Sequence, residues 1–167
     1  VSLNSLIISL FSIGHRDPCM PDKIHLTVAT VIEKDDYFLM VKETSFGKQV
    51  INQPAGHVEP GEDILQAAVR ETLEETGWDV SISGFLGIST HYASQNGVTY
   101  YRMTFVAEAI SHHQEYQIDD DIDCAVWMSV DEIIAAKHQL RSDMVLSCIE
   151  DYRAKRIFPL EIFRNKL

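Results

Sequence analysis

Three glutamates near the middle of the chain have the spacing of a catalytic cluster. Glu71, Glu74 and Glu75 stand at positions i, i+3 and i+4. A helix over residues 63–76 would therefore project all three carboxylates from one face, where like charges repel. Hard oxygen ligands of this kind suit Mg²⁺, with Mn²⁺ as a possible substitute. The alternative is a solvated acidic helix face, the usual fate of a charge run.

Signals at both ends support the predicted helix. Pro60-Gly61 marks a turn before it, and Gly77 is a natural residue for the position just after a helix. Glu62 and Asp63 are expected in the first turn, where the helix dipole favours negative charge. Because the loop and helix signals agree, we favour a site for divalent metal and phosphate over a solvated face.

The segment from Gly56 to Trp78 resembles the Nudix box, G-x5-E-x7-R-E-U-x-E-E-x-G-U, in which U is a bulky aliphatic residue. The matching positions are Gly56, Glu62, Arg70, Glu71, Glu74, Glu75 and Gly77. Thr72 and Trp78 depart from the two U positions. The Thr72 hydroxyl can bond back to the carbonyl of Ala68, so we expect a local packing change that leaves catalysis unaffected.

Flanking segments resemble the bacterial phosphatase NudJ subgroup of the Nudix hydrolases over roughly residues 25–162. They are residues 52–57, residues 121–124 with Trp127, residues 140–142 and residues 158–161. The resemblance implies an α/β fold, a Nudix-type α/β/α sandwich with a mixed β-sheet, and the mixed order of predicted strands and helices implies the same layers.

The NudJ resemblance also implies an activity. Enzymes of this kind are small, Mg²⁺-dependent phosphohydrolases that accept thiamine pyrophosphate, hydroxymethylpyrimidine pyrophosphate and nucleoside di- and triphosphates, and release inorganic phosphate. Two alternatives stay open. One is a nucleotide pyrophosphatase of another Nudix subgroup, and the other is a non-catalytic, nucleotide-sensing module. The module is disfavoured because every box glutamate is present.

The resemblance assigns roles to the box residues. The metal ligands would be the carbonyl of Gly56 and the side chains of Glu71, Glu74 and Glu75. Arg70 would hold the glutamates in place, and Glu62 would fix the shape of the loop.

Many Nudix enzymes recruit a further acid from the loop before the tryptophan strand. Here that loop contains Asp119, Asp120, Asp121 and Asp123. Asp121 is expected to be the recruited acid, because its distance before Trp127 resembles the family spacing; a solvated acidic loop is the alternative. The general base stays open among Glu71, Glu75 and Asp121. The catalytic set predicted from the sequence is therefore Arg70, Glu71, Glu75 and Asp121.

Three further residues are predicted to contact substrate. His57 lies beside the metal loop and could touch a phosphate, or be an exposed histidine with no task. Tyr100, Tyr101 and Arg102 lie on a strand expected to border the pocket, where the register decides which tyrosine faces it. His57, Tyr101 and Trp127 form the predicted substrate set.

Bulk composition limits the partners. A chain of 167 residues with 46% hydrophobic content fits one domain. Its net charge of −11 disfavours nucleic acid and anionic membrane, so we expect a small pyrophosphate substrate and a monomer or homodimer. Cys19, Cys124 and Cys148 are odd in number and widely spaced, which predicts neither disulfides nor zinc. Buried cysteines in a reducing cytoplasm are the expectation.

The first residues differ in composition from the rest. Residues 1–13 are largely apolar without Lys or Arg, and residues 14–18 break regular structure. We expect Met20 to be the native start, residues 1–19 to be a non-native or disordered leader, and residues 20–167 to form a single Nudix domain. A membrane-touching segment is the alternative.

Overall fold

The computed structural model describes residues 24–45, 47–94 and 97–164. The predicted leader, residues 1–19, lies outside these described residues, as does Met20. Within the described residues, no helix is long and apolar enough to cross a membrane.

A mixed sheet forms the centre of the domain. Its path runs β3-β2-β1-β6-β5, with β4 paired to β1 and β7 paired to β2. β1 and β6 are parallel, whereas the other pairs are antiparallel. The strands are β1 (Ile24–Lys34), β2 (Tyr37–Ser45), β3 (Lys48–Asn52), β4 (Ala55–His57), β5 (Trp78–Ala93), β6 (Val98–His112) and β7 (Ile122–Ser129).

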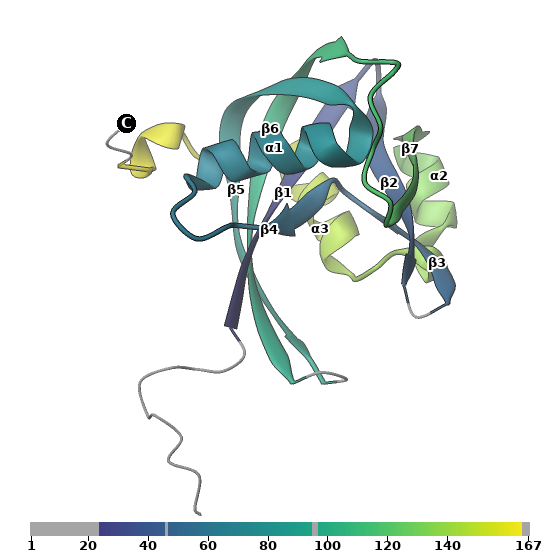
Figure 1. The fold of residues 1–167 in the computed structure, drawn as a ribbon, viewed down its shortest axis with the longest axis horizontal. Helices are drawn as coiled ribbons and strands as arrows, with labels where there is room; N and C mark the ends of the chain where they lie inside the picture. Colours follow the sequence, from purple (N-terminus) through teal and green to yellow (C-terminus); the bar gives the residue numbers. More distant parts are fainter. Residues whose placement is uncertain (1–23, 46, 95–96, 165–167) are drawn as a thin grey trace, which may run out of the picture.

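Helices pack on both faces of this sheet (Figure 1). Val28 and Phe105 pack with Ala67 and Ala68 of the first helix. Residues that point the opposite way from the same strands, such as Val31, pack against the third helix. The predicted α/β sandwich with a mixed sheet is therefore confirmed. The helical elements are α1 (Ile64–Thr76), α2 (Val130–Ala135) and α3 (Met144–Arg153), with short turns η1 (Lys137–Gln139) and η2 (Leu160–Ile162).

The ends of α1 match the predicted helix, with one correction. Gly77 closes the helix in the left-handed region, with φ of 69°, and its N–H donates to the carbonyl of Leu73. Asp63 is the N-cap, and its Oδ1 accepts the N–H groups of Leu65 and Gln66. Glu62 and Asp63 thus precede the helix. Asp63 acts by satisfying free backbone donors, which a dipole argument does not capture.

The predicted hydrogen bond from Thr72 to Ala68 is confirmed. Its Oγ1 donates to the carbonyl of Ala68 at 2.7 Å and lies 2.8 Å from the Oγ1 of Thr30 on β1. Both threonine side chains are fully buried. The position that usually takes an aliphatic residue therefore holds a satisfied polar pair between α1 and the sheet.

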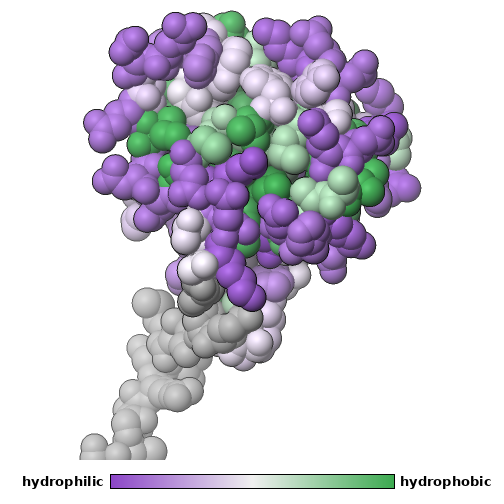
Figure 2. Space-filling view, turned by 90° about the vertical axis from the view of Figure 1, so that its right-hand side faces the viewer, coloured by the Kyte–Doolittle hydropathy of each residue, from purple (hydrophilic) through white to green (hydrophobic). Residues whose placement is uncertain are grey.

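The surface in Figure 2 is mostly hydrophilic, and the two described cysteines differ in burial. Figure 2 shows one face of the molecule, where hydrophilic side chains predominate with apolar ones between them, as on an ordinary folded domain. Cys148 is buried on α3, whereas Cys124 is only partly buried. Both are free thiols.

Candidate active site

Arg70 forms hydrogen bonds with several carboxylates on α1 and in the loop before it. Its Nη1 donates to Glu71 and Glu74, at 2.8 Å each, and its Nε donates to Glu62 at 2.7 Å. Its Nη2 reaches the carbonyl of His57 at 3.0 Å and the second oxygen of Glu62 at 2.9 Å. One guanidinium therefore connects the helix to the loop before it. The hydrogen bond from Arg70 is also the main reason that the pKa of Glu62 is lowered.

Glu75 has a different environment on the same helix. Its side chain is buried, and its Oε2 accepts the backbone N–H of Ala55 at 2.8 Å. Burial raises the pKa of Glu75 to about 8, and the charges of Glu71, Glu43 and Asp119 act in the same direction. The carboxyl therefore holds a proton at neutral pH unless a cation lies beside it.

Gly56 lies directly against the helix. A Cβ at this position would overlap the carboxylate of Glu71, so any larger residue would displace the end of that side chain. Burial raises the pKa of Glu71, although Arg70 opposes the shift. The glycine and the glutamate of the predicted metal site are thus adjacent in space.

The acidic loop contributes Asp119 to this cluster. Its backbone N–H donates to the carbonyl of Glu74 at 2.9 Å. Burial is the main cause that raises the pKa of Asp119, and the charge of Glu74 is the next. The charge of Asp119 in turn raises the pKa of Glu71 and of Glu75. Asp121 is exposed, and its charge is among those that raise the pKa of Asp119. The contact of this loop with α1 is therefore made by Asp119, two residues before the predicted Asp121.

The register selects Tyr100 as the tyrosine beside His57. His25 Nδ1 lies 2.9 Å from His57 Nε2, and the ring of Tyr100 lies 5.3 Å from that of His25 and 6.2 Å from that of His57. Burial lowers the pKa of His57, with a smaller effect from His25. Tyr101 points to the other face of the sheet and is exposed, so the predicted Tyr101 lies apart from these rings.

Trp127 lies in a different part of the fold from His57 and Tyr101. Its ring packs edge-on against Trp78, 5.6 Å between centroids, in the cluster that contains Ile32. Tyr101 pairs with Leu26, six residues before Ile32 on β1, which corresponds to about 20 Å along a strand. The structure therefore does not bring Trp127 together with His57 and Tyr101.

Comparison with known proteins decides the family. A model of the NUDIX domain matches residues 23–147, which is most of the chain. The chain belongs to the NUDIX family. It is 37% identical over 140 residues to the phosphatase NudJ of Escherichia coli K12, which covers 84% of this chain and 90% of that protein.

Solved structures agree with this membership. A NUDIX hydrolase from Nitrosomonas europaea is 44% identical, with a TM-score of 0.82 over 86% of this chain and 97% of its own. A MutT NUDIX hydrolase from Burkholderia pseudomallei, at 20% identity and a TM-score of 0.65, shares the fold over 78% of this chain and 98% of its own. The protein is a NUDIX hydrolase, similar to NudJ, and enzymes of this family generally use divalent metals and act on small molecules.

The NUDIX donor set fits a hard divalent cation. Glu71, Glu74 and Glu75 offer carboxylate oxygens, and Gly56 leaves its backbone accessible beside Glu71. Among the described residues, no three acidic, histidine or cysteine side chains converge closely enough to hold a metal as they stand. Arg70 binds Glu71 and Glu74, and Ala55 binds Glu75, so these side chains must turn to share one ion.

A second group of polar residues in this NUDIX fold was not assigned a role by sequence reasoning. Arg102 of β6 donates to Asn52, the last residue of β3, and to Gln53, the residue after it. Arg141 forms an ion pair of 2.7 Å with Glu43 of β2. The sequence offered one signal for Arg102, because in a strand it points to the same face of the sheet as Tyr100, two residues before it. Its partners, about 50 residues away, were not visible without the sheet order.

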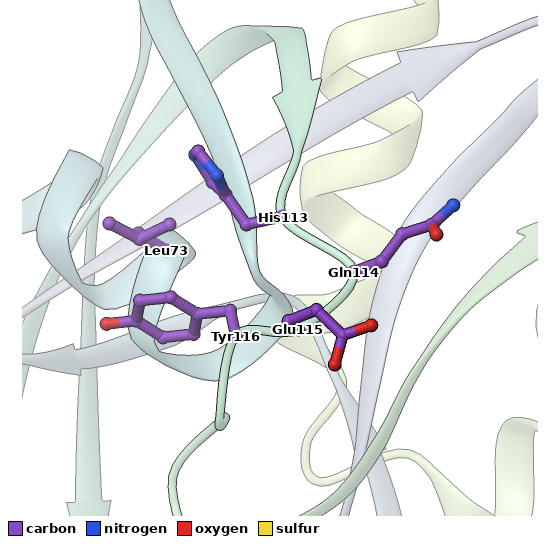
Figure 3. Close-up of a pocket in the computed structure, with 5 residues that line it drawn as sticks. All are labelled: Leu73, His113, Gln114, Glu115 and Tyr116. Atoms are coloured by element: carbon purple, nitrogen blue, oxygen red, sulfur yellow. The ribbon is translucent and has the colours of Figure 1, made fainter.

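A surface hollow lies beyond the box carboxylates. It has a volume of about 570 Å³ and is lined by Leu73 of α1 and residues of the loop after β6: His113, Gln114, Glu115 and Tyr116. Figure 3 shows the rings of His113 and Tyr116 on either side of Leu73. The Nε2 of His113 lies 2.6 Å from Oδ2 of Asp79. No box glutamate lines this hollow, so it does not account for the chemistry of the family.

Proposed function

We propose that this NUDIX hydrolase is a Mg²⁺-dependent phosphohydrolase of small pyrophosphorylated compounds that releases inorganic phosphate. Thiamine pyrophosphate, hydroxymethylpyrimidine pyrophosphate and nucleoside di- and triphosphates are the proposed substrates. Mn²⁺ is the proposed substitute metal. The observation that carries the proposal is the approach of Gly56 to Glu71, because it brings the loop backbone against the helix that also bears Glu74 and Glu75, and oxygen donors of this kind suit a hard divalent cation.

The chemistry follows from these donors. A bound divalent ion would polarise a phosphoryl oxygen and make a coordinated water more acidic. Glu71, Glu74, Glu75 and the carbonyl of Gly56 would hold it. Arg70 would orient the glutamates from behind through its bonds to Glu62 and the loop carbonyl of His57.

The base that takes the proton from water is proposed to be a carboxylate of this cluster. The candidates from the sequence are Glu71, Glu75 and Asp121. The structure adds Asp119 as a candidate, because its backbone N–H donates to the carbonyl of Glu74 and its charge raises the pKa of Glu71 and Glu75. A carboxylate with a raised pKa is suited to accept a proton near neutral pH.

The organic part of the substrate is proposed to meet the rings of His25, His57 and Tyr100. Edge and face contacts with rings tolerate many ring types, which supports a broad substrate range. The net charge of −11 supports small-molecule substrates over nucleic acid or anionic membrane. We propose a cytoplasmic monomer or homodimer.

Product analysis tests the proposal. Thiamine pyrophosphate, a nucleoside triphosphate and a dinucleotide would each be incubated with Mg²⁺ in ¹⁸O-labelled water and followed by phosphorus NMR. The expected products are thiamine monophosphate and inorganic phosphate, and stepwise loss of phosphate from the nucleotide. Label confined to pyrophosphate, or to a nucleoside monophosphate from the dinucleotide without turnover of thiamine pyrophosphate, would indicate another NUDIX subgroup.

A further inference from the structure

Arg102 is a buried arginine that pairs with no carboxylate in the described part of the chain. Its residue is only 6% exposed. The ion pairs formed among the described residues do not include it, and its Nε makes no hydrogen bond with any described group. Burial therefore lowers the pKa of Arg102, and removing such a charge from water costs free energy that ordinary core packing would avoid.

The hydrogen bonds that Arg102 does make all lead to one segment. Its Nη1 donates to Asn52 Oδ1 at 3.2 Å, and its Nη2 donates to Gln53 Oε1 at 2.8 Å. Gln53 in turn donates to the carbonyl of Val145 on α3 at 2.8 Å. Both amide side chains are buried. The guanidinium thus joins β6 to residues 52–53, and Gln53 joins them to α3.

The same segment continues into the box loop. The carbonyl of Pro54 accepts the N–H of Thr30 at 3.0 Å, and the N–H of Ala55 donates to Glu75 at 2.8 Å. Gly56, the next residue, lies against Glu71 with no space for a Cβ. A small movement of residues 52–54 would therefore move both Ala55 and Gly56 relative to the glutamates.

We propose that Arg102 is a positioning residue, which holds residues 52–54 so that Gly56 stays against the box glutamates and the metal ligands remain preorganised. This inference rests on the proposed metal-dependent function. Arg102 acts through Asn52 and Gln53 on the loop and does not touch substrate. Its fixed planar fork serves two acceptors at once, which a lysine does not.

The affinity of the site for a metal ion distinguishes two possible effects of Arg102, the positioning of the loop and the electrostatic effect of its charge. A cation near the site repels a metal ion, so if the charge of Arg102 were its only effect, Arg102→Met would tighten Mn²⁺ binding. Loss of positioning would weaken it. Gln53→Ala removes the two side-chain hydrogen bonds of Gln53, with Arg102 and Val145, without changing any charge, so it separates the two effects even if Arg102→Met fails to fold. Arg156→Met, which removes an exposed arginine paired with Asp151, is the matched control.

The experiment is a Mn²⁺ titration by electron paramagnetic resonance, without substrate and well below each melting temperature. We expect Arg102→Met, Arg102→Lys and Gln53→Ala each to weaken Mn²⁺ binding by about tenfold or more, the range found for groups behind metal ligands, with Arg156→Met unchanged. Unchanged or tighter binding in Gln53→Ala and in folded Arg102→Met overturns the inference. Absence of Mn²⁺ binding in the unmodified protein would instead overturn the proposed function.

Discussion

Two arginines of this domain illustrate opposite uses of the same side chain. Arg70 is partly exposed, at 26%, and binds three carboxylates, Glu71 and Glu74 of α1 and Glu62 of the loop before it. Arg102 is buried on β6, binds two neutral amides and pairs with no carboxylate among the described residues. The first neutralises a repulsive cluster, whereas the second fixes a backbone segment. The comparison shows that charge compensation and loop placement are supplied from separate parts of the fold.

The acidic face of α1 should be the more sensitive of the two regions in catalysis. We predict that Glu75→Gln lowers kcat by several orders of magnitude in saturating Mg²⁺ and leaves the fold intact, because it keeps side-chain volume and removes a ligand charge. Steady-state kinetics and circular dichroism would measure both. The exposed Glu161→Gln serves as a control. A purified Glu75→Gln enzyme with about a tenth or more of the original rate would remove Glu75 from the site.

Arg70→Lys tests whether the fork geometry on this face matters. Arg70 makes five hydrogen bonds with four residues, Glu62, Glu71, Glu74 and His57. A lysine ammonium keeps the charge but not this geometry. We expect a loss of about 10–100-fold in activity or metal affinity, typical for groups that orient metal ligands. Arg156→Lys is the control. Kinetics equal to the unmodified enzyme at every Mg²⁺ concentration would show that charge alone suffices.

The raised pKa of Glu75 makes the stability of the metal-free protein depend on pH. The folded value of about 8 exceeds the ordinary value of 4.5, so the folded protein binds more protons between these limits than the unfolded chain. The resulting stabilisation is complete below pH 4.5 and is lost as pH rises through about 8. We predict that metal-free protein loses stability over this window and that Glu75→Gln loses less.

Urea unfolding in a chelator at several pH values measures this difference. Glu71 and Asp119 also have raised pKa values, so both proteins should show some loss as pH rises. Only the difference between the two curves belongs to Glu75. Parallel curves for the unmodified protein and Glu75→Gln would contradict the raised pKa.

Local features of the site could be predicted from the sequence, and distant pairings could not. The bond from Thr72 to Ala68 spans one helical turn, and Gly77 ends α1 by its own backbone preference. Arg102 and Asn52 are 50 residues apart and meet only through the sheet order. The choice between Tyr100 and Tyr101 likewise needed the strand register.

Long-range packing explains the Trp127 result. Its contact with Trp78 joins β7 to the start of β5, and the sequence contains no periodic signal for that pairing. Asp119 was one of four aspartates in the predicted loop, and the structure joins it to α1 through a backbone bond to Glu74. Such contacts depend on the assembled fold, so composition and spacing do not rank the candidates.

The smallest predicted effect on activity concerns the buried threonine pair on the sheet side of α1. Thr72→Val keeps the side-chain shape but leaves the hydroxyl of Thr30 without its partner at 2.8 Å. We expect a stability loss of about 1–3 kcal/mol, the cost of an unsatisfied buried polar group. The rate should stay unchanged, because the carboxylates lie on another side of the helix.

A double-mutant cycle with Thr30→Val sharpens this prediction. Replacing both hydroxyls removes the unsatisfied group, so the double variant should lose less free energy of unfolding than the two single variants added together. Chemical unfolding gives the four free energies, and kinetics on the same samples reports the site. Strict additivity would mean that the two hydroxyls do not interact. A marked fall in kcat for Thr72→Val would mean instead that the sheet side of α1 controls the carboxylate side, and that packing and catalysis are coupled through the helix.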